Sequence, residues 1–392
     1  MAQRIITGID IGSHSVRAVI TEYAPGSGLP RIIGMGKAES RGLRHGYIIN
    51  ISDAVKSVRT AVMEAEQVAG VKVREAYVSV GGVGLEGVQT TGAAVTSRAD
   101  SEITESDIDR AHRVCESNVP QPANKKILHT IPIEHKIDGK KVYGRPLGMK
   151  GLKLEESCLI VTCLDQHLND LIRAVEEAGV EPIDACAAPI AASFVALTKA
   201  QKMAGCVLAN IGAETVSIVV YEDGIPISLE VFPVGSTDIT NDIALGLKIP
   251  LEEAELVKLG KGGHQFPRKK LNDIMLSRME DMFSLVIAHL KKLGKHELLP
   301  AGIVLTGGGS GIETIEDFAR AAMHLPSKIP SVTIDFADNT KSKKSLKDTS
   351  WFVAYGLAIW GVTNDRPALA AGDNMVARIK ESFKNIVKQL LP

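Results

Sequence analysis

A short pattern near the start of the chain returns 200 residues later. In residues 5–20, an apolar run reaches Asp10, a tight turn follows, and a second run alternates apolar with polar residues. In residues 209–220, Asn210 takes the place of Asp10, and a similar turn and second run follow. Either stretch alone is also compatible with an ordinary β-hairpin. Together they predict a duplicated α/β fold whose two halves face each other.

The first turn has the composition of a phosphate-binding loop. Gly12 lets a ligand approach the backbone closely, and the hydroxyls of Ser13 and Ser15 lie among consecutive N–H groups. Asp10 is badly suited to bare phosphate, but well suited to hold a water of a Mg²⁺ ion that bridges phosphates. The sequence therefore predicts that the phosphates of a nucleotide lie between the two turns.

A third glycine-rich segment follows an apolar run at residues 301–311, AGIVLTGGGSG. Glycines between a strand and a helix permit a ring or a phosphate to approach backbone amides. A glycine triplet alone is a weak signal, but after two matched hairpins it favours a third loop of the same site. Two helices of small residues, expected at 189–197 and 350–361, would pack closely between the halves as a hinge.

Composition limits the classes of function. A chain of 392 residues can hold two or more domains with sizeable cores. The net charge of −1 and the aromatic content of 4% argue against nucleic-acid binding. The five cysteines lack CxxC or Cys/His spacing, so we expect buried reduced thiols and no zinc site. With no secretion signal and no bilayer-spanning run, the body is expected to be cytoplasmic.

A change in the pattern of polar and apolar residues predicts an insertion into the first half. Thr104 and Asp107 form a capping-box pattern before a helix, and strand-like segments follow at 127–137, 142–147 and 158–163. We read this part as a small α+β subdomain. The expected divisions are 1–82 and 161–200 for the first half, 83–160 for the insertion, 201–361 for the second half with a helical part at about 236–300, 362–374 for a linker, and 375–392 for a terminal helix.

The last segment reads as a basic amphipathic helix. Four basic residues against Glu381 give it a charge of +3. Its apolar residues fall within an arc of roughly 140° on a helical wheel. This pattern is typical of an interfacial membrane anchor, although a helix docked on the protein's own core is the alternative. The expected membrane-binding residues are Val376, Ile379, Lys380, Phe383, Lys384, Ile386, Val387, Lys388, Leu390 and Leu391.

These motifs resemble those of the actin/Hsp70/sugar-kinase ATPase superfamily, and within it the FtsA family of bacterial cell-division actin homologues. The segment 127–157 is similar to the insertion of that family. The resemblance implies a duplicated actin-like (ribonuclease H-like) fold that binds ATP and Mg²⁺. It also implies filaments of the chain with itself on the cytoplasmic side of an anionic inner-membrane surface at the division site, where the terminal helix would hold FtsZ filaments to the membrane.

The family's site residues carry over by motif. The implied ATP-binding set is Asp10, Gly12, Ser13, Ser15, Arg17, Asn210, Gly212, Thr215, Glu255, Lys258, Gly307, Gly308, Gly309 and Ser310, with Asp10 also holding Mg²⁺ through water. Arg278 falls where the family has a basic residue important for the FtsZ tail, although Ser277 stands where a proline is usual.

The second phosphate loop departs from the family pattern. Asn210 replaces the usual acid, and Ala213 and Glu214 replace two glycines. Asn cannot supply the charge that helps to position Mg²⁺ and water, and Glu214 would place a carboxylate beside a polyphosphate. We therefore expect ATP binding with slow or absent hydrolysis. Two alternative functions on the same fold are a scaffold of type IV pilus assembly that binds a partner's cytoplasmic peptide, and a small-molecule kinase.

Overall fold

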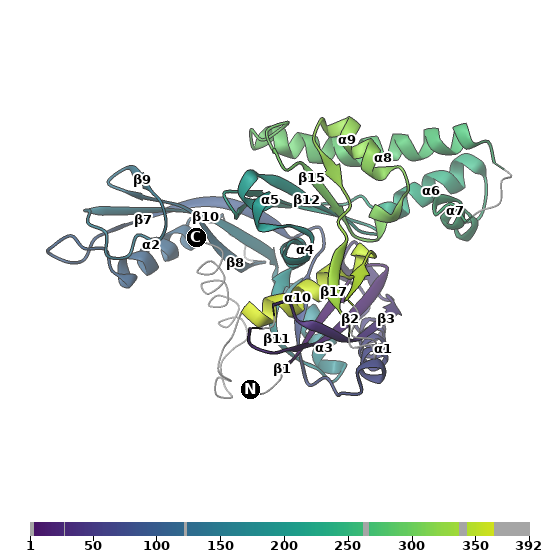
Figure 1. The fold of residues 1–392 in the computed structure, drawn as a ribbon, viewed down its shortest axis with the longest axis horizontal. Helices are drawn as coiled ribbons and strands as arrows, with labels where there is room; N and C mark the ends of the chain where they lie inside the picture. The colour runs from purple at the N-terminus through teal and green to yellow at the C-terminus, as the bar shows by residue number, and fades with distance from the viewer. Residues whose placement is uncertain (1–3, 27, 121–123, 262–265, 337–342, 364–392) are drawn as a thin grey trace.

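The computed structural model describes residues 4–26, 28–120, 124–261, 266–336 and 343–363 (Figure 1). Two five-stranded sheets form the two halves of the body. The first has the order β11-β6-β1-β2-β3, from β1 (Arg4–Ile11), β2 (Ser15–Tyr23), β3 (Arg31–Glu39), β6 (Glu75–Val80) and β11 (Glu181–Ala187). The second has the order β14-β13-β12-β15-β16, from β12 (Cys206–Ile211), β13 (Val216–Glu222), β14 (Ile225–Phe232), β15 (Ile303–Thr306) and β16 (Ser327–Lys328).

The two sheets repeat one topology, with an antiparallel three-stranded meander followed by two parallel strands. The register of the hairpins is also the same. Asp10 pairs with Arg17 across β1 and β2, and Asn210 pairs with Ser217 across β12 and β13. The predicted duplication is therefore confirmed.

Helices of small residues join the halves, as predicted. Helix α4 (Ala188–Ala196) packs against α10 (Phe352–Thr363), which also contacts β1 (Figure 1). A Cβ on Gly356 would lie only 1.9 Å from the carbonyl oxygen of Ala191, so the two helices approach as closely as a glycine permits. One hydrophobic core runs from the first sheet through both helices into the second half.

A second core lies between the other sheet and its helices. These are α6 (Ser236–Leu247), α7 (Leu251–Lys258), α8 (Arg268–Lys292) and α9 (Ile315–Met323), and the first half carries α1 (Ile51–Ala69) and α3 (Asp165–Glu177). The short elements are β4 (Leu43–Arg44), β5 (Tyr47–Ile48), α5 (Lys199–Ala204), η1 (Gly308–Gly311), β17 (Val332–Asp335), β18 (Lys343–Leu346) and η2 (Thr349–Trp351).

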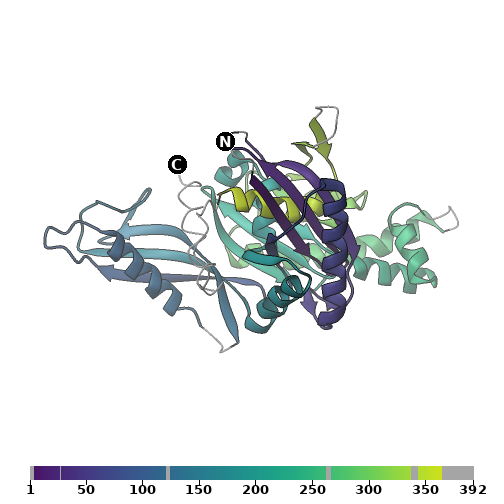
Figure 2. The ribbon, with the colours of Figure 1, turned by 90° about the horizontal axis from the view of Figure 1, so that it is seen from below.

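The predicted insertion is a four-stranded sheet that projects from the body, with one helix on it (Figure 2). Its order is β7-β10-β8-β9, from β7 (Glu86–Val95), β8 (Lys125–Ile137), β9 (Lys140–Val142) and β10 (Lys153–Leu164). Helix α2 (Glu105–Ser117) begins at the predicted capping box of Thr104 and Asp107. The strand expected at 142–147 is wrong, because β9 ends at Val142.

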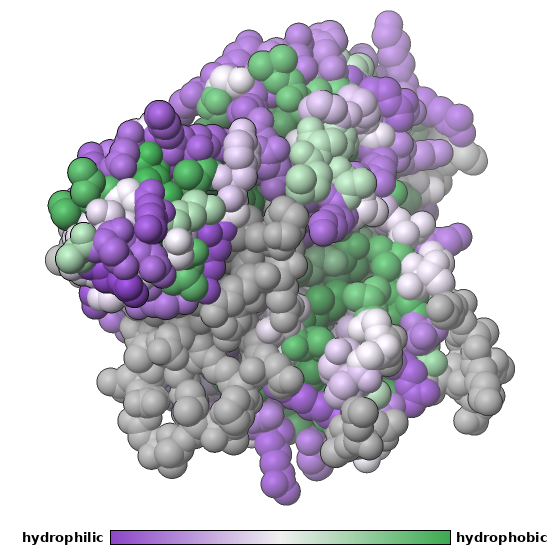
Figure 3. Space-filling model, turned by 60° about the vertical axis from the view of Figure 1, so that its left-hand side comes forward, coloured by the Kyte–Doolittle hydropathy of each residue, from purple (hydrophilic) through white to green (hydrophobic). Residues whose placement is uncertain are grey.

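The surface is mixed in polarity on the face drawn in Figure 3, where hydrophobic side chains gather in a hollow beside hydrophilic ones. On the insertion, the exposed apolar side chains include Val95, Tyr143 and Leu152. Within the described ranges, no helix has the length and apolarity needed to span a membrane. The predicted terminal helix and its membrane-binding residues lie outside the described residues.

Candidate functional site

The matched turns of both halves open into one cleft with a volume of about 680 Å³. It is lined by the end of β1, the turn after it, the equivalent turn after β12, the glycine loop after β15, and α6 and α7. The cleft brings together thirteen predicted residues, namely Asp10, Gly12, Ser13, Ser15, Arg17, Asn210, Gly212, Thr215, Glu255, Lys258, Gly307, Gly308 and Gly309.

The two phosphate-loop candidates have the same backbone geometry. The N–H of Gly12 donates to the carbonyl of Ser15 over 3.3 Å, and the N–H of Gly212 donates to the carbonyl of Thr215 over 2.8 Å. The N-terminus of α6 adjoins the second turn, since the N–H of Ser236 donates to the carbonyl of Gly212 over 3.0 Å. Turn amides and a helix N-terminus are both favourable surroundings for phosphate.

The neighbouring strand β6 holds the side chain of Asp10 in place. The Ser79 hydroxyl donates to Asp10 Oδ1 over 2.8 Å and accepts the N–H of Ile11 over 3.1 Å. Burial raises the pKa of Asp10, although Arg17 and the Ser79 hydrogen bond act to lower it. A divalent cation in the cleft would favour the carboxylate form of Asp10. A carboxylate at this position is suited to accept a hydrogen bond from a Mg²⁺-bound water.

Arg17 reaches the cleft from β2. Its guanidinium carbon lies 5.7 Å from the centre of the Trp351 ring, within the range of a cation–π contact. Burial lowers the pKa of Arg17, and the carboxylates of Asp10 and Asp348 oppose that shift. The side chain nonetheless stays cationic at neutral pH, because an arginine in a protein is always protonated.

The three glycines of the loop at 307–309 differ in what a side chain would meet at each position. Gly307 has a φ of 84°, and a Cβ there would lie 2.4 Å from Asn210 Oδ1. A Cβ on Gly309 would lie 2.4 Å from Ile211 Cγ2. A Cβ on Gly308 would meet no atom within 4 Å, so this residue offers bare backbone to the cleft.

Ser310 does not join the other predicted residues in the cleft lining. Its hydroxyl is buried, donates to the carbonyl of Gly307 over 2.8 Å, and lies 2.8 Å from the Thr349 hydroxyl. The structure thus places Ser310 behind the loop, where it holds the loop in shape.

Glu255 and Lys258, from α7, form an internally neutralised pair at the cleft wall. Lys258 Nζ lies 2.7 Å from Glu255 Oε2 and donates to Thr240 Oγ1 over 2.8 Å and to the carbonyl of Ser236 over 3.1 Å. Burial acts to raise the pKa of Glu255, but the hydrogen bonds from Lys258 and Thr240 lower it overall. The pair therefore braces the α6–α7 wall and adds no net charge to the cleft.

Glu214 is turned differently from the sequence expectation. Its Oε2 accepts the backbone N–H of His45, between β4 and β5, over 2.5 Å, and its carbonyl lies 3.3 Å from His45 Nδ1. The next amide, of Gly46, donates to Ser13 Oγ over 2.9 Å. Neither Ala213 nor Glu214 adopts a positive φ, so a Cβ is accommodated at both positions. The carboxylate thus joins the second turn to the β4–β5 hairpin of the first half.

Sequence reasoning missed several residues of the cleft. Ser79, Gly81 and Gly82 line it from the end of β6, and Lys37 and Asp348 line it from β3 and the segment before η2. The signal for the first three was available, because a strand followed by paired glycines is the pattern that identified residues 307–309. No local signal marks Lys37 or Asp348.

Arg278 lies on α8 and does not line the cleft. Its Nε and one terminal nitrogen donate to the two carboxylate oxygens of Asp242, over 2.6 and 3.1 Å, and Asp281 lies 3.4 Å away. These acids raise the pKa of Arg278. The guanidinium is partly exposed at the surface formed by α6 and α8, so it is accessible to a partner while its orientation is held by Asp242.

The chain matches two family models. Residues 207–356 match the cell division protein FtsA, and residues 84–162 match the SHS2 domain inserted in FtsA. FtsA of Pseudomonas aeruginosa is 31% identical over 348 residues, which are 83% of this chain and 82% of that relative. FtsA of Bacillus subtilis is 30% identical over 349 residues, with shares of 83% and 78%.

Solved structures with the same fold are more distant in sequence. The PilM–PilN type IV pilus biogenesis complex has a TM-score of 0.70 at 16% identity and covers 92% of this chain and 99% of that chain. MreB5 of Spiroplasma citri bound to ADP has a TM-score of 0.53 at 14% identity, with shares of 92% and 97%. The duplicated sheets, the inserted subdomain and these relatives agree, and the chain belongs to the FtsA family of cell division proteins, with an actin-like fold.

Proposed function

We propose that this chain is an ATP-binding, actin-like cell-division protein that polymerises on a membrane surface at the division site and tethers FtsZ filaments there. The observation that carries nucleotide binding is the cleft of about 680 Å³, into which turns from both halves and a glycine loop open together. Small-molecule sites have volumes of about 300–1,000 Å³, so the cleft has room for a nucleotide. A relative of the same fold, MreB5, is bound to ADP.

The residues suggest how ATP would lie. The turn amides near Gly12 and Gly212 would bind the phosphates, and Asp10 would hold Mg²⁺ through a water. The open backbone at Gly308 would accept the flat face of the base, because no side chain fills that space. The Mg²⁺ ion would neutralise phosphate charge between the two turns. Asn210 lacks the charge of the equivalent Asp10, so we expect slow or absent hydrolysis.

Two glycine substitutions test nucleotide binding. A Cβ at Gly308 or at Gly311 would meet no neighbouring atom, but only Gly308 lines the cleft. Gly308→Val should therefore place a side chain where the base is proposed to lie and abolish binding of ATP in calorimetry, with little change in melting temperature. Gly311→Val is the matched control and should bind ATP normally. Equal ATP affinity in both variants would contradict the proposed site.

Membrane attachment is a second part of the proposal. The sequence of 375–392 predicts a basic amphipathic helix, which would be suited to anionic lipid, and a filament that presents many such segments would bind more firmly than one chain. The full chain should float with anionic vesicles, and a chain ending at Asn374 should not. Flotation of the shortened chain would refute the anchor. Electron microscopy of the full chain with ATP on an anionic lipid monolayer tests for filaments.

The contact with FtsZ is the third part. The partly exposed Arg278, oriented by Asp242, is suited to an acidic peptide. Arg278→Glu should weaken binding of the FtsZ C-terminal tail, measured by fluorescence anisotropy, while exposed Arg173→Glu on α3 should not. The family membership favours this function over a pilus scaffold or a small-molecule kinase, and a phosphorylation screen that finds a small-molecule substrate would reverse that preference.

A further inference from the structure

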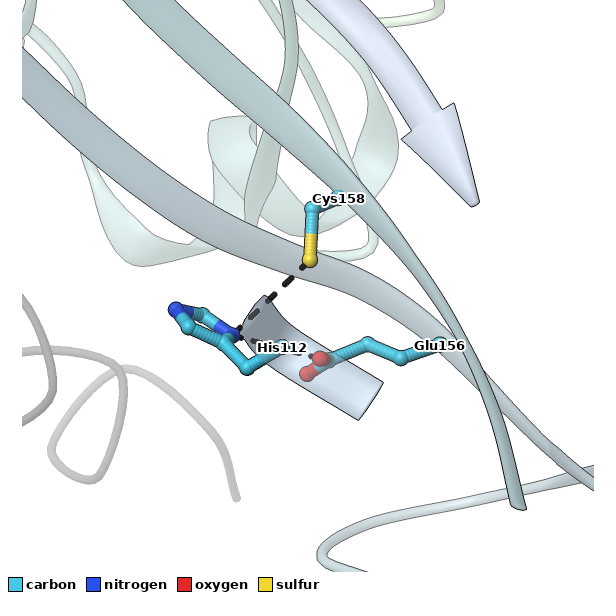
Figure 4. Close-up of side chains that lie close together, drawn as sticks. All are labelled: His112, Glu156 and Cys158. Carbon is cyan, nitrogen blue, oxygen red and sulfur yellow. Dashed lines mark hydrogen bonds and ion pairs between the residues drawn. The ribbon is translucent and has the colours of Figure 1, made fainter. Parts of the chain in front are cut away.

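The insertion contains a compact cluster of potential metal ligands that lies away from the nucleotide cleft. His112 comes from α2, and Glu156 and Cys158 come from one face of β10 (Figure 4). His112 Nδ1 lies 3.2 Å from Glu156 Oε2 and 4.0 Å from Cys158 Sγ. All three ligand atoms lie within 4.8 Å of one another. The side chains converge on one point between the helix and the sheet.

The distances are close to those of a tetrahedral zinc site. With zinc about 2.0–2.2 Å from N and O ligands and about 2.3 Å from S, the ligand atoms of a tetrahedron lie about 3.4–3.6 Å apart. The pair at 3.2 Å lies about 0.2 Å below this range, and the pair at 4.0 Å needs a shift of about half an ångström. The Glu156–Cys158 pair, which lies within 4.8 Å, needs a shift of at most about 1.3 Å. Changes of side-chain torsion supply shifts of this size. A water would complete the set from the side of His112, whose side chain is 12% exposed.

The charge and softness of the ligands identify the class of ion. A carboxylate, a thiolate and a neutral imidazole carry two negative charges, which a divalent cation cancels. Cancellation matters here because the Glu156 side chain is only 1% exposed and Cys158 is fully buried. Thiolate and imidazole together select zinc over Mg²⁺ or Ca²⁺, which take oxygen ligands.

A second histidine holds the carboxylate in place. His135 is directly opposite Glu156 in the β8–β10 ladder, and its Nε2 lies 3.2 Å from Glu156 Oε1. The two carboxylate oxygens of Glu156 thus each contact one histidine, Oε2 with His112 and Oε1 with His135. The pairing of β10 with β8 shifts register between Ser157 and Cys158, where Ile133 of β8 has no partner in the ladder. Such supporting contacts orient metal ligands in proteins.

We propose that His112, Glu156 and Cys158 bind one zinc ion that cross-links α2 to β10 and stabilises the insertion. Binding deprotonates the Cys158 thiol and releases its proton to water, because only the thiolate coordinates the metal. Zinc affinity should accordingly rise with pH.

Cobalt titration of the full chain tests the site. Co²⁺ should give a thiolate charge-transfer band that saturates at one equivalent, and Zn²⁺ should displace it. X-ray absorption of the zinc-loaded wild type should show one sulfur ligand at about 2.3 Å. This second measurement needs no variant, so it stands even if a substitution unfolds the insertion. Absence of the band, or a zinc shell without sulfur, would refute the proposal and leave a metal-free His–Glu–His network.

Three variants separate ligands from neighbours. Cys158→Ser should remove the band and weaken zinc binding by more than about 100-fold, and His135→Gln should weaken it by about 10- to 100-fold while keeping the band. Cys163→Ser is the matched control, since Cys163 is equally buried on the same strand and outside the cluster. Wild-type zinc affinity in Cys158→Ser would overturn the assignment.

Discussion

The hydrogen bond of the Glu214 carboxylate allows a prediction of how fast a nucleotide would leave the cleft. The carboxylate accepts the backbone N–H of His45 over 2.5 Å and so connects the second phosphate loop to the β4–β5 hairpin of the other half. In Glu214→Ala this hydrogen bond is lost and the 3.3 Å contact between the residue 214 carbonyl and His45 Nδ1 remains, while the turn keeps a Cβ that its backbone accommodates. Because this hydrogen bond joins the two halves between which the nucleotide is proposed to lie, we expect its loss to speed nucleotide release.

The size of the effect follows from the kind of hydrogen bond. Hydrogen bonds to a charged group contribute about 1.5–3 kcal/mol, and the lower value applies here because both partners are only partly buried. A free energy of about 1.4 kcal/mol corresponds to a factor of ten, so nucleotide dissociation should accelerate about tenfold. The Gly46–Ser13 hydrogen bond lies within the first half and is unaffected.

Stopped-flow displacement of a fluorescent ATP analogue measures this rate. Glu39→Ala is the control, because the Glu39 side chain is 71% exposed and makes only a 3.4 Å contact with Arg41. A decrease in the dissociation rate would be equally informative. If the Glu214 carboxylate faced the polyphosphate, its removal would relieve repulsion and slow release. A slower or unchanged rate would therefore refute the bridging role.

Three further predictions concern stability and chemistry. Lys202 is buried between Phe194 and Tyr221, and burial lowers its pKa from 10.5 to about 8. Between these pKa values the unfolded chain binds the proton more tightly than the folded chain, so the unfolding free energy should rise by up to about 1.4 kcal/mol per pH unit from pH 8 to 10.5. In urea titrations Lys202→Met should lose that rise, and Lys199→Met, at an exposed position, should keep it. Gly356→Ala should lower the unfolding free energy by about 1–3 kcal/mol despite its better helix propensity, because the Cβ meets a carbonyl at 1.9 Å; an unchanged melting temperature would show that α4 and α10 separate freely. Asn210→Asp should raise Mg²⁺-dependent phosphate release, by about 10²–10⁴-fold if the acid acts as a base, and brisk release by the wild type would contradict the expected slow hydrolysis.

Several features could be predicted from local sequence because their causes are local. A glycine in a tight turn, an acid before it and alternation after it specify a hairpin, and the repetition of that pattern specified the duplicated fold. The capping box of Thr104 and Asp107 placed the start of α2, because both partners of the cap lie within one turn. The burial of all five cysteines was also expected from their apolar neighbours.

Other features depend on packing between distant segments. The direction of Glu214 was decided by His45, and the support of Asp10 by Ser79 on another strand. Ser310 follows the glycine triplet in sequence, yet Thr349 holds it behind the loop. In each case the partner lies far along the chain, so no spacing rule could connect the two.

The metal-ligand cluster shows this division most clearly. The sequence argued against zinc because its five cysteines lack CxxC or Cys/His spacing, and His112 and Cys158 are indeed 46 residues apart. Only the packing of α2 on β10 brings them together, and only the β8–β10 register sets His135 opposite Glu156. Local periodicity and turn chemistry thus determined the fold and most of the cleft. The side-chain contacts between elements were decided by tertiary packing, because burial and charge pairing act through space.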